Sequence, residues 1–101
     1  MPSSLPLQYL PAAQEDLLSI LEHIALDSPS RPVTFTDLLD QRIGALSPHP
    51  QLGRVPRHPH LRAMNYRVLV IESYLVFYKH RETFIEIHRV VHGSRNLDHL
   101  L

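Results

Sequence analysis

The sequence contains no cysteine, so the chain can form no disulfide, no thiolate metal site and no cysteine nucleophile. It also lacks any apolar run close to the roughly eighteen residues needed to cross a bilayer. The first ten residues carry no basic segment of the kind that opens a secretion signal. We therefore expect a cytoplasmic protein without membrane association.

The chain has no excess charge of either sign, with ten Lys and Arg against ten Asp and Glu. Its two halves nevertheless differ. Residues 1–50 carry six acidic and two basic side chains, a net charge of −4, whereas residues 51–101 carry eight basic and four acidic side chains, a net charge of +4. This division indicates one face that binds anions. A chance difference between a helical half and a sheet half is the alternative interpretation.

No internal repeat, low-complexity tract or linker divides the 101 residues, which is the length of one small domain with a single modest core. Hydrophobic residues make up 44% of the chain and charged residues 20%, a balance typical of a globular protein and not of a disordered one. We expect residues 1–101 to form a single domain.

The spacing of apolar residues predicts two helices followed by three strands. The first helix begins at Pro11, which suits a helix's first turn, and its apolar stripe is Ala13, Leu17, Ile20, Leu21 and Ile24. A second helix is expected over residues 32–46 after a short link, which makes the pair a helical hairpin. Three strands are expected over residues 66–72, 74–79 and 84–91, whose β-branched and aromatic residues and short connections predict an antiparallel meander.

The remaining segments complete the expected fold. Residues 5–10 alternate enough to form a short first strand, which Pro6 restricts to an edge or a strand start. Residues 47–65 contain four Pro and one Gly, so they cannot hold a long regular element and form a basic loop that leads into the sheet. The order β-α-α-β-β-β predicts an α+β fold, with the helical hairpin packed on one face of an antiparallel sheet.

One residue conflicts with the pattern of the last strand. Strict alternation places Arg89 on the same face as Ile85, Ile87 and Val91, beneath the helices, where an unpaired cation is costly. Either a bulge near His88 exchanges the two faces, or Arg89 is paired at the rim of the sheet. The sequence leaves both possibilities open.

Four segments carry a resemblance to a known family: PAAQEDLLSILEHIA in the first helix, HPQLGR after the second, NYRVLVIESYLVFYKH across the strand hairpin, and IEIHRVVHGSRN at the end. Together, and in this order, they resemble the RelE/ParE superfamily of toxins from bacterial type II toxin–antitoxin (plasmid stabilisation) systems. The resemblance implies two helices on a curved antiparallel sheet, which agrees with the order of elements obtained from the residues.

The superfamily has two functional branches, and the last two segments look closer to the ParE branch. ParE-like members poison DNA gyrase, whereas RelE-like members are metal-independent mRNA interferases that cut messenger RNA on the ribosome. Both are neutralised by a cognate antitoxin, so the resemblance implies a toxin–antitoxin hetero-oligomer with gyrase, or with the ribosome and mRNA, as target. A degenerate toxin that retains only antitoxin binding is a third possibility.

The resemblance also implies site residues. The strand arginine of both branches falls on Arg67, His92 stands where some nucleases place a catalytic His, and Arg95 where others place a catalytic Arg. The C-terminal Tyr of the nucleases has no counterpart, since Gly93 and Leu101 occupy the nearest positions, and this weakens the nuclease hypothesis. Binding of antitoxin or target is expected at the cations of the sheet and tail: Arg67, Lys79, Arg89 and Arg95.

Two further residue types have alternative readings. The histidines His58, His60, His88 and His92 are spaced loosely like metal ligands, but no closed tetrahedral set with acidic partners appears, so we expect no metal and no other cofactor. Tyr74 and Tyr78 share one face of a strand and could stack on bases. We favour surface loop positions for the histidines and packing in the core for the two tyrosines.

Overall fold

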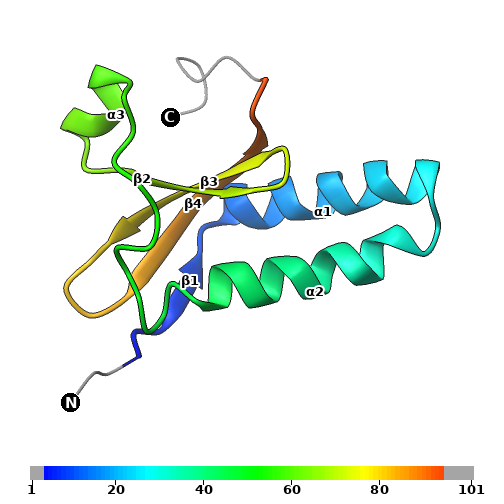
Figure 1. The fold of residues 1–101 in the computed structure, drawn as a ribbon, viewed down its shortest axis with the longest axis horizontal. Helices are drawn as coiled ribbons and strands as arrows, with labels where there is room; N and C mark the ends of the chain where they lie inside the picture. The colour runs from blue at the N-terminus through cyan, green and yellow to red at the C-terminus, as the bar shows by residue number, and fades with distance from the viewer. Residues whose placement is uncertain (1–3, 95–101) are drawn as a thin grey trace.

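The computed structural model describes residues 4–94, a range that contains three helices and four strands (Figure 1). In chain order they are β1 (Leu7–Tyr9), α1 (Pro11–Asp27), α2 (Arg31–Gly44), α3 (Pro59–Ala63), β2 (Arg67–Ile71), β3 (Tyr74–His80) and β4 (Ile85–His92). Among the described residues no helix has the length and apolar character to span a membrane.

The four strands form one sheet in the order β1-β4-β3-β2. The expected antiparallel meander is confirmed, because β2 pairs with β3 and β3 pairs with β4 in antiparallel register. β1 adds to the outer edge of β4 in parallel, with Leu7 opposite Ile85. This parallel pair was not predicted from the sequence. It arises because β1 and β4 are joined through the whole helical hairpin and two further strands, and such a long connection permits either direction.

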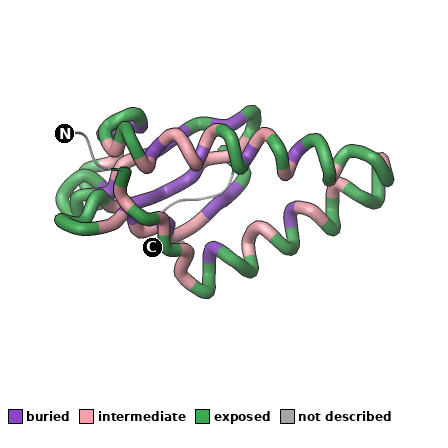
Figure 2. The backbone as a smooth tube through the Cα atoms, turned by 90° about the horizontal axis from the view of Figure 1, so that it is seen from below, coloured by how far each residue is buried: buried purple, intermediate pink, exposed green. Residues whose placement is uncertain are grey.

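The helical hairpin covers one face of the sheet, as the apolar stripes of the helices predict. Its helices bury Ala13 and Ile20 from α1 and Phe35, Leu39 and Ile43 from α2. These side chains share a core with the inward residues of the strands, and Tyr78 is fully buried among them. Figure 2 shows that the strands carry the longest buried stretches, while the far ends of α1 and α2 are largely exposed.

The opposite face of the sheet is covered in part by α3, a five-residue helix within the proline-rich segment. The sequence correctly excluded a long element here, but it did not predict this short one. Pro59 occupies a first-turn position, where the missing N–H costs nothing. Leu61 of α3 packs with Tyr66, Val68 and Phe77 in a second, smaller core.

The conflict at Arg89 is resolved by both of the expected devices together. The register between β3 and β4 shifts so that Phe77 faces Arg89 and Tyr78 faces Ile87, which leaves His88 as the extra residue of a β-bulge. Arg89 is also paired, because its guanidinium contacts the carboxylate of Asp16 on α1. After the bulge, the apolar side chains of β4 again pack in the two cores.

Candidate functional site

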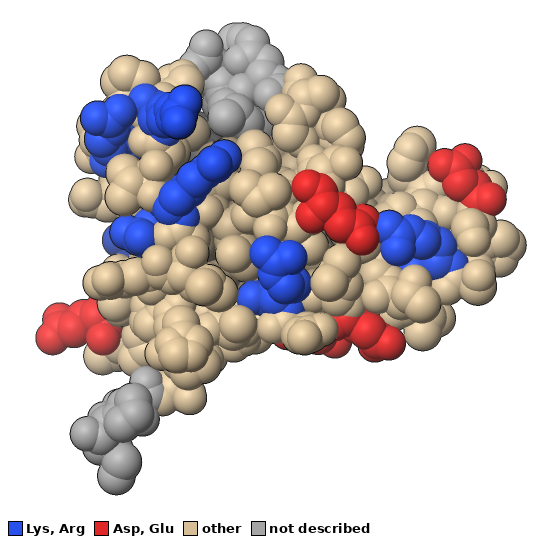
Figure 3. All heavy atoms as spheres, in the orientation of Figure 1, with Lys and Arg blue, Asp and Glu red and all other residues tan. Residues whose placement is uncertain are grey.

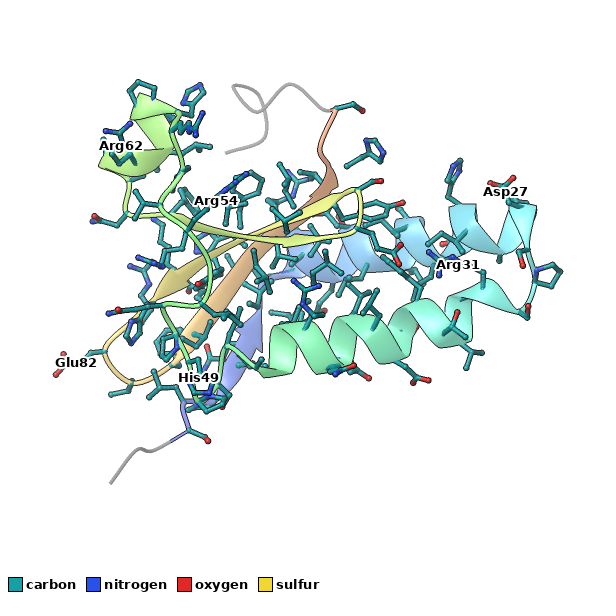
Figure 4. The ribbon with its side chains drawn as sticks, in the orientation of Figure 1. Asp27, Arg31, His49, Arg54, Arg62 and Glu82 are labelled. Carbon is teal, nitrogen blue, oxygen red and sulfur yellow. The ribbon has the colours of Figure 1, made fainter. Side chains whose placement is uncertain are left out.

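The basic side chains of residues 54–79 gather on the side of the molecule that carries α3. Figure 3 shows this cluster of Lys and Arg, with most of the visible acidic side chains over the helical hairpin. Figure 4 places Arg54 and Arg62 beside α3, at the opposite end of the molecule from Asp27 and Arg31. Three arginines of the described chain form carboxylate pairs: Arg31, Arg81 and Arg89. The other Lys and Arg between residues 4 and 94 have no carboxylate within 4.0 Å: Arg42, Arg54, Arg57, Arg62, Arg67 and Lys79.

Arg67, the predicted strand arginine, holds the loop that precedes α3. Its Nε and Nη2 donate to the carbonyl oxygen of Gly53 at 3.1 and 2.6 Å, and Nη2 also donates to that of Gln51 at 3.1 Å. The side chain is half-buried. Arg67 therefore fixes the loop against β2, and a partner that binds Arg67 must share the guanidinium with these carbonyls.

The buried hydroxyl of Tyr78 holds the same loop from inside. It accepts a hydrogen bond from the backbone N–H of Gly53 at 2.9 Å and donates to the carbonyl of Pro50 at 2.8 Å. A Cβ at residue 53 would lie 2.6 Å from this hydroxyl, so only glycine fits without a shift. The core position expected for Tyr78 is confirmed, and its hydroxyl positions the basic loop.

A hollow of about 370 Å³ lies beside Arg67 and is lined by two further cations, Lys79 and Arg81. The ammonium group of Lys79 sits 4.5 Å from the centre of the Tyr66 ring, within the range of a cation–π contact. The hollow is open and basic, and it suits an anionic group such as a carboxylate or a phosphate.

A chain of hydrogen bonds runs along the same face of the sheet. The Tyr66 hydroxyl lies 3.0 Å from Nδ1 of His88, whose Nε2 lies 2.7 Å from the carboxylate of Glu86. Arg81 donates to the same carboxylate oxygen from Nε and Nη2, at 3.1 and 2.9 Å. One carboxylate oxygen of Glu86 thus joins His88 and Arg81, and both ring nitrogens of His88 have a neighbour within hydrogen-bond distance.

The network shifts the pKa values of its members. Burial is the largest influence on His88 and lowers its pKa, and the positive charges of Lys79 and Arg81 act in the same direction. Burial raises the pKa of Glu86, but the hydrogen bonds from His88 and Arg81 outweigh it and leave that pKa lowered. Burial raises the pKa of Tyr66, with Glu86 adding to the effect. The neutral imidazole therefore accepts from Tyr66 at Nδ1 and donates to Glu86 from Nε2.

Arg89, also predicted to bind a partner, is engaged within the chain. Its Nε and Nη2 donate to the two carboxylate oxygens of Asp16 at 2.7 and 2.8 Å, a geometry that raises the pKa of Arg89. Asp16 also accepts the backbone N–H of Val90 at 2.9 Å. Asp16 thereby covers the edge of β4 beyond its pairing with β1. A carboxylate from another molecule would have to compete with Asp16 for the Arg89 guanidinium.

His92 is exposed at the end of β4. Its Nδ1 lies 2.8 Å from the hydroxyl of Ser94, and its ring meets that of half-buried Tyr74 edge-on. The ring of Tyr74 packs against the helix-side core, as favoured from the sequence. Arg95, the third residue of the nuclease hypothesis, lies outside the described residues.

The structure does not bring Arg67 and His92 together. Arg67 pairs with Tyr78 near one end of β3, whereas His92 pairs with Tyr74 at the other end. Four residues of strand separate the two positions, which is about 13 Å along the sheet. The catalytic role assigned to these residues stays a prediction, and as a pair they do not form one compact centre.

The sequence analysis did not predict the hydrogen-bonded network of Tyr66, His88 and Glu86. Glu86 and His88 stand two residues apart on one strand, so they share a face, and that spacing was the available signal. The contribution of Tyr66 depends on the pairing of β2 with β3 and β3 with β4, which no local pattern encodes. Among residues 4–94 no three His, Asp or Glu side chains are arranged to hold a metal ion.

The far end of the helical hairpin carries exposed apolar side chains. Leu26, in the last turn of α1, is 83% exposed, and Val33, in the first turn of α2, is 67% exposed. Both lie next to the turn that joins the helices, away from the sheet (Figure 1). We call this region, residues 26–33, the hairpin tip.

Comparison with known proteins agrees with this architecture. The family model of the ParE toxin of the type II toxin–antitoxin system parDE matches residues 7–97. A solved structure titled "Chromosomal ParDE TA system from P. aeruginosa" superposes with a TM-score of 0.74, covering 88% of this chain and 96% of the other. Its sequence is 18% identical, so this likeness concerns the fold. A search of curated proteins gives no match.

The helical hairpin on one face of a small sheet, together with the matching family model, identifies a toxin domain of the RelE/ParE superfamily. Within that superfamily the chain belongs to the ParE toxin family of type II toxin–antitoxin systems.

Proposed function

We propose that this ParE-family toxin stops growth by poisoning DNA gyrase through direct protein contact and is neutralised by a cognate antitoxin. The observation that carries the proposal is the hairpin tip. Leu26 and Val33 are each more than half exposed, although neither is needed by the core. Exposed apolar side chains on both helices at the end of a projecting element favour a protein partner.

The polar side chains are engaged by neighbours within the fold, which supports a toxin that acts by protein contact and not by catalysis. Arg67 is bonded to loop carbonyls, Arg89 to Asp16, and the imidazole of His88 to neighbours on both nitrogens. Such groups are satisfied by the fold itself and serve stability first. The surface left for gyrase is then the hairpin, together with the segment after β4. Action on gyrase also places the toxin in the cytoplasm.

A supercoiling assay tests the proposal. Purified toxin added to gyrase, relaxed plasmid and ATP should leave the plasmid relaxed, and added antitoxin should restore supercoiling. Full supercoiling at a large molar excess of folded toxin would reject gyrase as the target.

One observation favours a second function, an mRNA interferase. The Tyr66–His88–Glu86 network borders a hollow lined by Arg67, Lys79 and Arg81, and phosphodiester cleavage through the 2′-hydroxyl needs a proton acceptor beside cations. In that reaction His88 would accept the proton of the attacking 2′-hydroxyl through Tyr66, and the cations would stabilise the phosphorane. As the bond from phosphorus to the 5′-oxygen breaks, the protonated His88 would return the proton to that oxygen by the same route. Primer extension on messenger RNA after induction should then show cuts within codons. Growth arrest with intact messages would exclude this function.

A further inference from the structure

A second hollow, of about 340 Å³, lies between α3 and the sheet and is separate from the hairpin tip. Its floor is apolar, formed by Leu61, Val68 and Phe77 of the smaller core, with half-buried Leu75 as one wall. The volume admits a bulky apolar side chain from another molecule. We call this hollow the α3 pocket.

The rim of the α3 pocket is basic. Arg54 and Arg57 line it, both are exposed, and neither has a carboxylate partner among residues 4–94. Figure 3 shows no Asp or Glu beside this cluster on the face in view. An apolar floor below two unneutralised arginines matches a segment that presents an apolar side chain flanked by carboxylates.

The walls of the pocket are held in place before any partner arrives. The backbone of Arg54 exchanges two hydrogen bonds with Val68, at 2.9 and 2.8 Å. Arg62 donates to the carbonyl oxygens of Pro56 and Arg57 at 3.4 and 2.9 Å. A preformed pocket lowers the ordering cost of binding, because little of the toxin must be fixed on association.

We infer that the α3 pocket is the anchor point for the cognate antitoxin, which inserts one apolar side chain while neighbouring carboxylates pair with Arg54 and Arg57. This inference rests on the proposed toxin–antitoxin function and adds where the partner binds. An acidic segment that orders on binding fits the basic rim, because its charge is complementary and its apolar residue reaches the floor.

Nucleic acid is the less suitable occupant. Recognition of single-stranded bases uses exposed aromatic faces for stacking. Of the ring side chains at the pocket, Phe77 has no exposed surface and nearby Tyr66 is only 5% exposed. His58, which also lines the pocket, is half-buried and already engaged by a neighbour. The pocket therefore offers a partner its positively charged rim and its apolar hollow, and not an aromatic face. A peptide can match these features with carboxylates and one apolar side chain.

The test measures binding of purified full-length toxin variants to the antitoxin, taken as the coexpressed protein that restores growth. Arg54→Glu and Arg57→Glu should each slow association about tenfold at low salt. Leu75→Ala, which removes part of the apolar wall, should weaken affinity about tenfold through faster dissociation. Arg42→Glu is the matched control, because it makes the same charge change on α2, where Arg42 donates to the Val70 carbonyl and does not line the pocket.

Three results would overturn the inference. Equal affinity of the Arg54 and Arg42 variants would show that only net charge matters. Displacement of the antitoxin by a single-stranded oligonucleotide, weakened by Arg57→Glu, would assign the pocket to nucleic acid. Tighter antitoxin binding after deletion of residues 95–101 would show that the chain's own end competes for the pocket.

The experiments distinguish a failure of the docking-site inference from a failure of the gyrase proposal. Arg54→Glu toxin should still inhibit supercoiling but resist rescue by antitoxin. If the wild-type toxin has no effect on gyrase and its antitoxin affinity still depends on Arg54, the docking site stands and the gyrase proposal fails.

Discussion

At the scale of single residues, the basic loop depends on a close fit between Gly53 and Tyr78. The hydroxyl of Tyr78 serves the Gly53 N–H and the Pro50 carbonyl together, and the glycine leaves no room for a side chain. Because Arg67 also donates to the Gly53 carbonyl, the loop is fixed by contacts that a local sequence pattern does not reveal.

Gly53→Ala should destabilise the protein by about 1–3 kcal/mol, because the added methyl group meets the Tyr78 hydroxyl at 2.6 Å and the Val68 carbonyl at 2.9 Å. Gly44→Ala is the matched control. A Cβ there has no atom within 4 Å, and alanine in a helix should add up to about 1 kcal/mol of stability. Urea unfolding of both variants checks the prediction, and equal effects would contradict the fit described for Gly53.

The Asp16–Arg89 pair should contribute more to stability than the other arginine–carboxylate pairs. Asp16→Ala removes three hydrogen bonds to a partly buried carboxylate and should cost about 2–3 kcal/mol. Glu72→Ala, which breaks the exposed pair with Arg31, should cost less than about 1 kcal/mol. Chemical denaturation measures both, and a cost for Asp16→Ala as small as that for Glu72→Ala would refute the ranking.

The His88 network should make stability depend on pH. Folding lowers the pKa of His88 below 6.5, so the unfolded chain takes up the proton first, and the stability present above that pH is lost as the pH falls below it. The lowered pKa of Glu86 extends the loss to more acidic pH. His88→Gln should flatten the fall in unfolding free energy between about pH 7 and pH 5. His60→Gln, an exposed change on α3, should leave the slope unaltered, and an unaltered slope in both variants would contradict the assignment.

At the scale of secondary-structure elements, local periodicity predicted the two long helices and the three-stranded meander. It could not predict the parallel pairing of β1, because that pair joins residues nearly eighty positions apart, Leu7 with Ile85. The helix α3 was hidden because proline signals a break more strongly than it signals a helix start. At Arg89 the alternation pattern identified a conflict correctly, and its resolution required the positions of both Asp16 and the bulge at His88.

At the scale of the whole molecule, the uneven charge of the sequence indicated a basic face, and the basic side chains of residues 54–79 gather on the side of the molecule that carries α3 (Figure 3). Of the predicted binding residues, Arg67 and Arg89 are engaged within the chain, Lys79 lines the basic hollow, and Arg95 lies outside the described residues. Whether a cation is free for a partner depends on its carboxylate neighbours in space, which is why Arg54 and Arg57 were not singled out from sequence.

The overall arrangement separates two surfaces, the hairpin tip that we propose for the target and the α3 pocket that we propose for the antitoxin. Leu26→Glu and Val33→Glu change exposed side chains, so each should alter stability by no more than about 0.5 kcal/mol. Antitoxin affinity should also remain as in the wild type, because neither residue lines the α3 pocket.

The most direct measurement is the yield of DNA cleavage complexes trapped on gyrase by purified toxin and by its Leu26→Glu/Val33→Glu variant. The wild-type toxin should convert plasmid into linear DNA on denaturation of the complex, and the variant should lower that yield at least tenfold while it still binds antitoxin. Equal yields from the two proteins would remove the hairpin tip from the account, and no cleavage complex with the wild-type toxin would contradict gyrase poisoning itself.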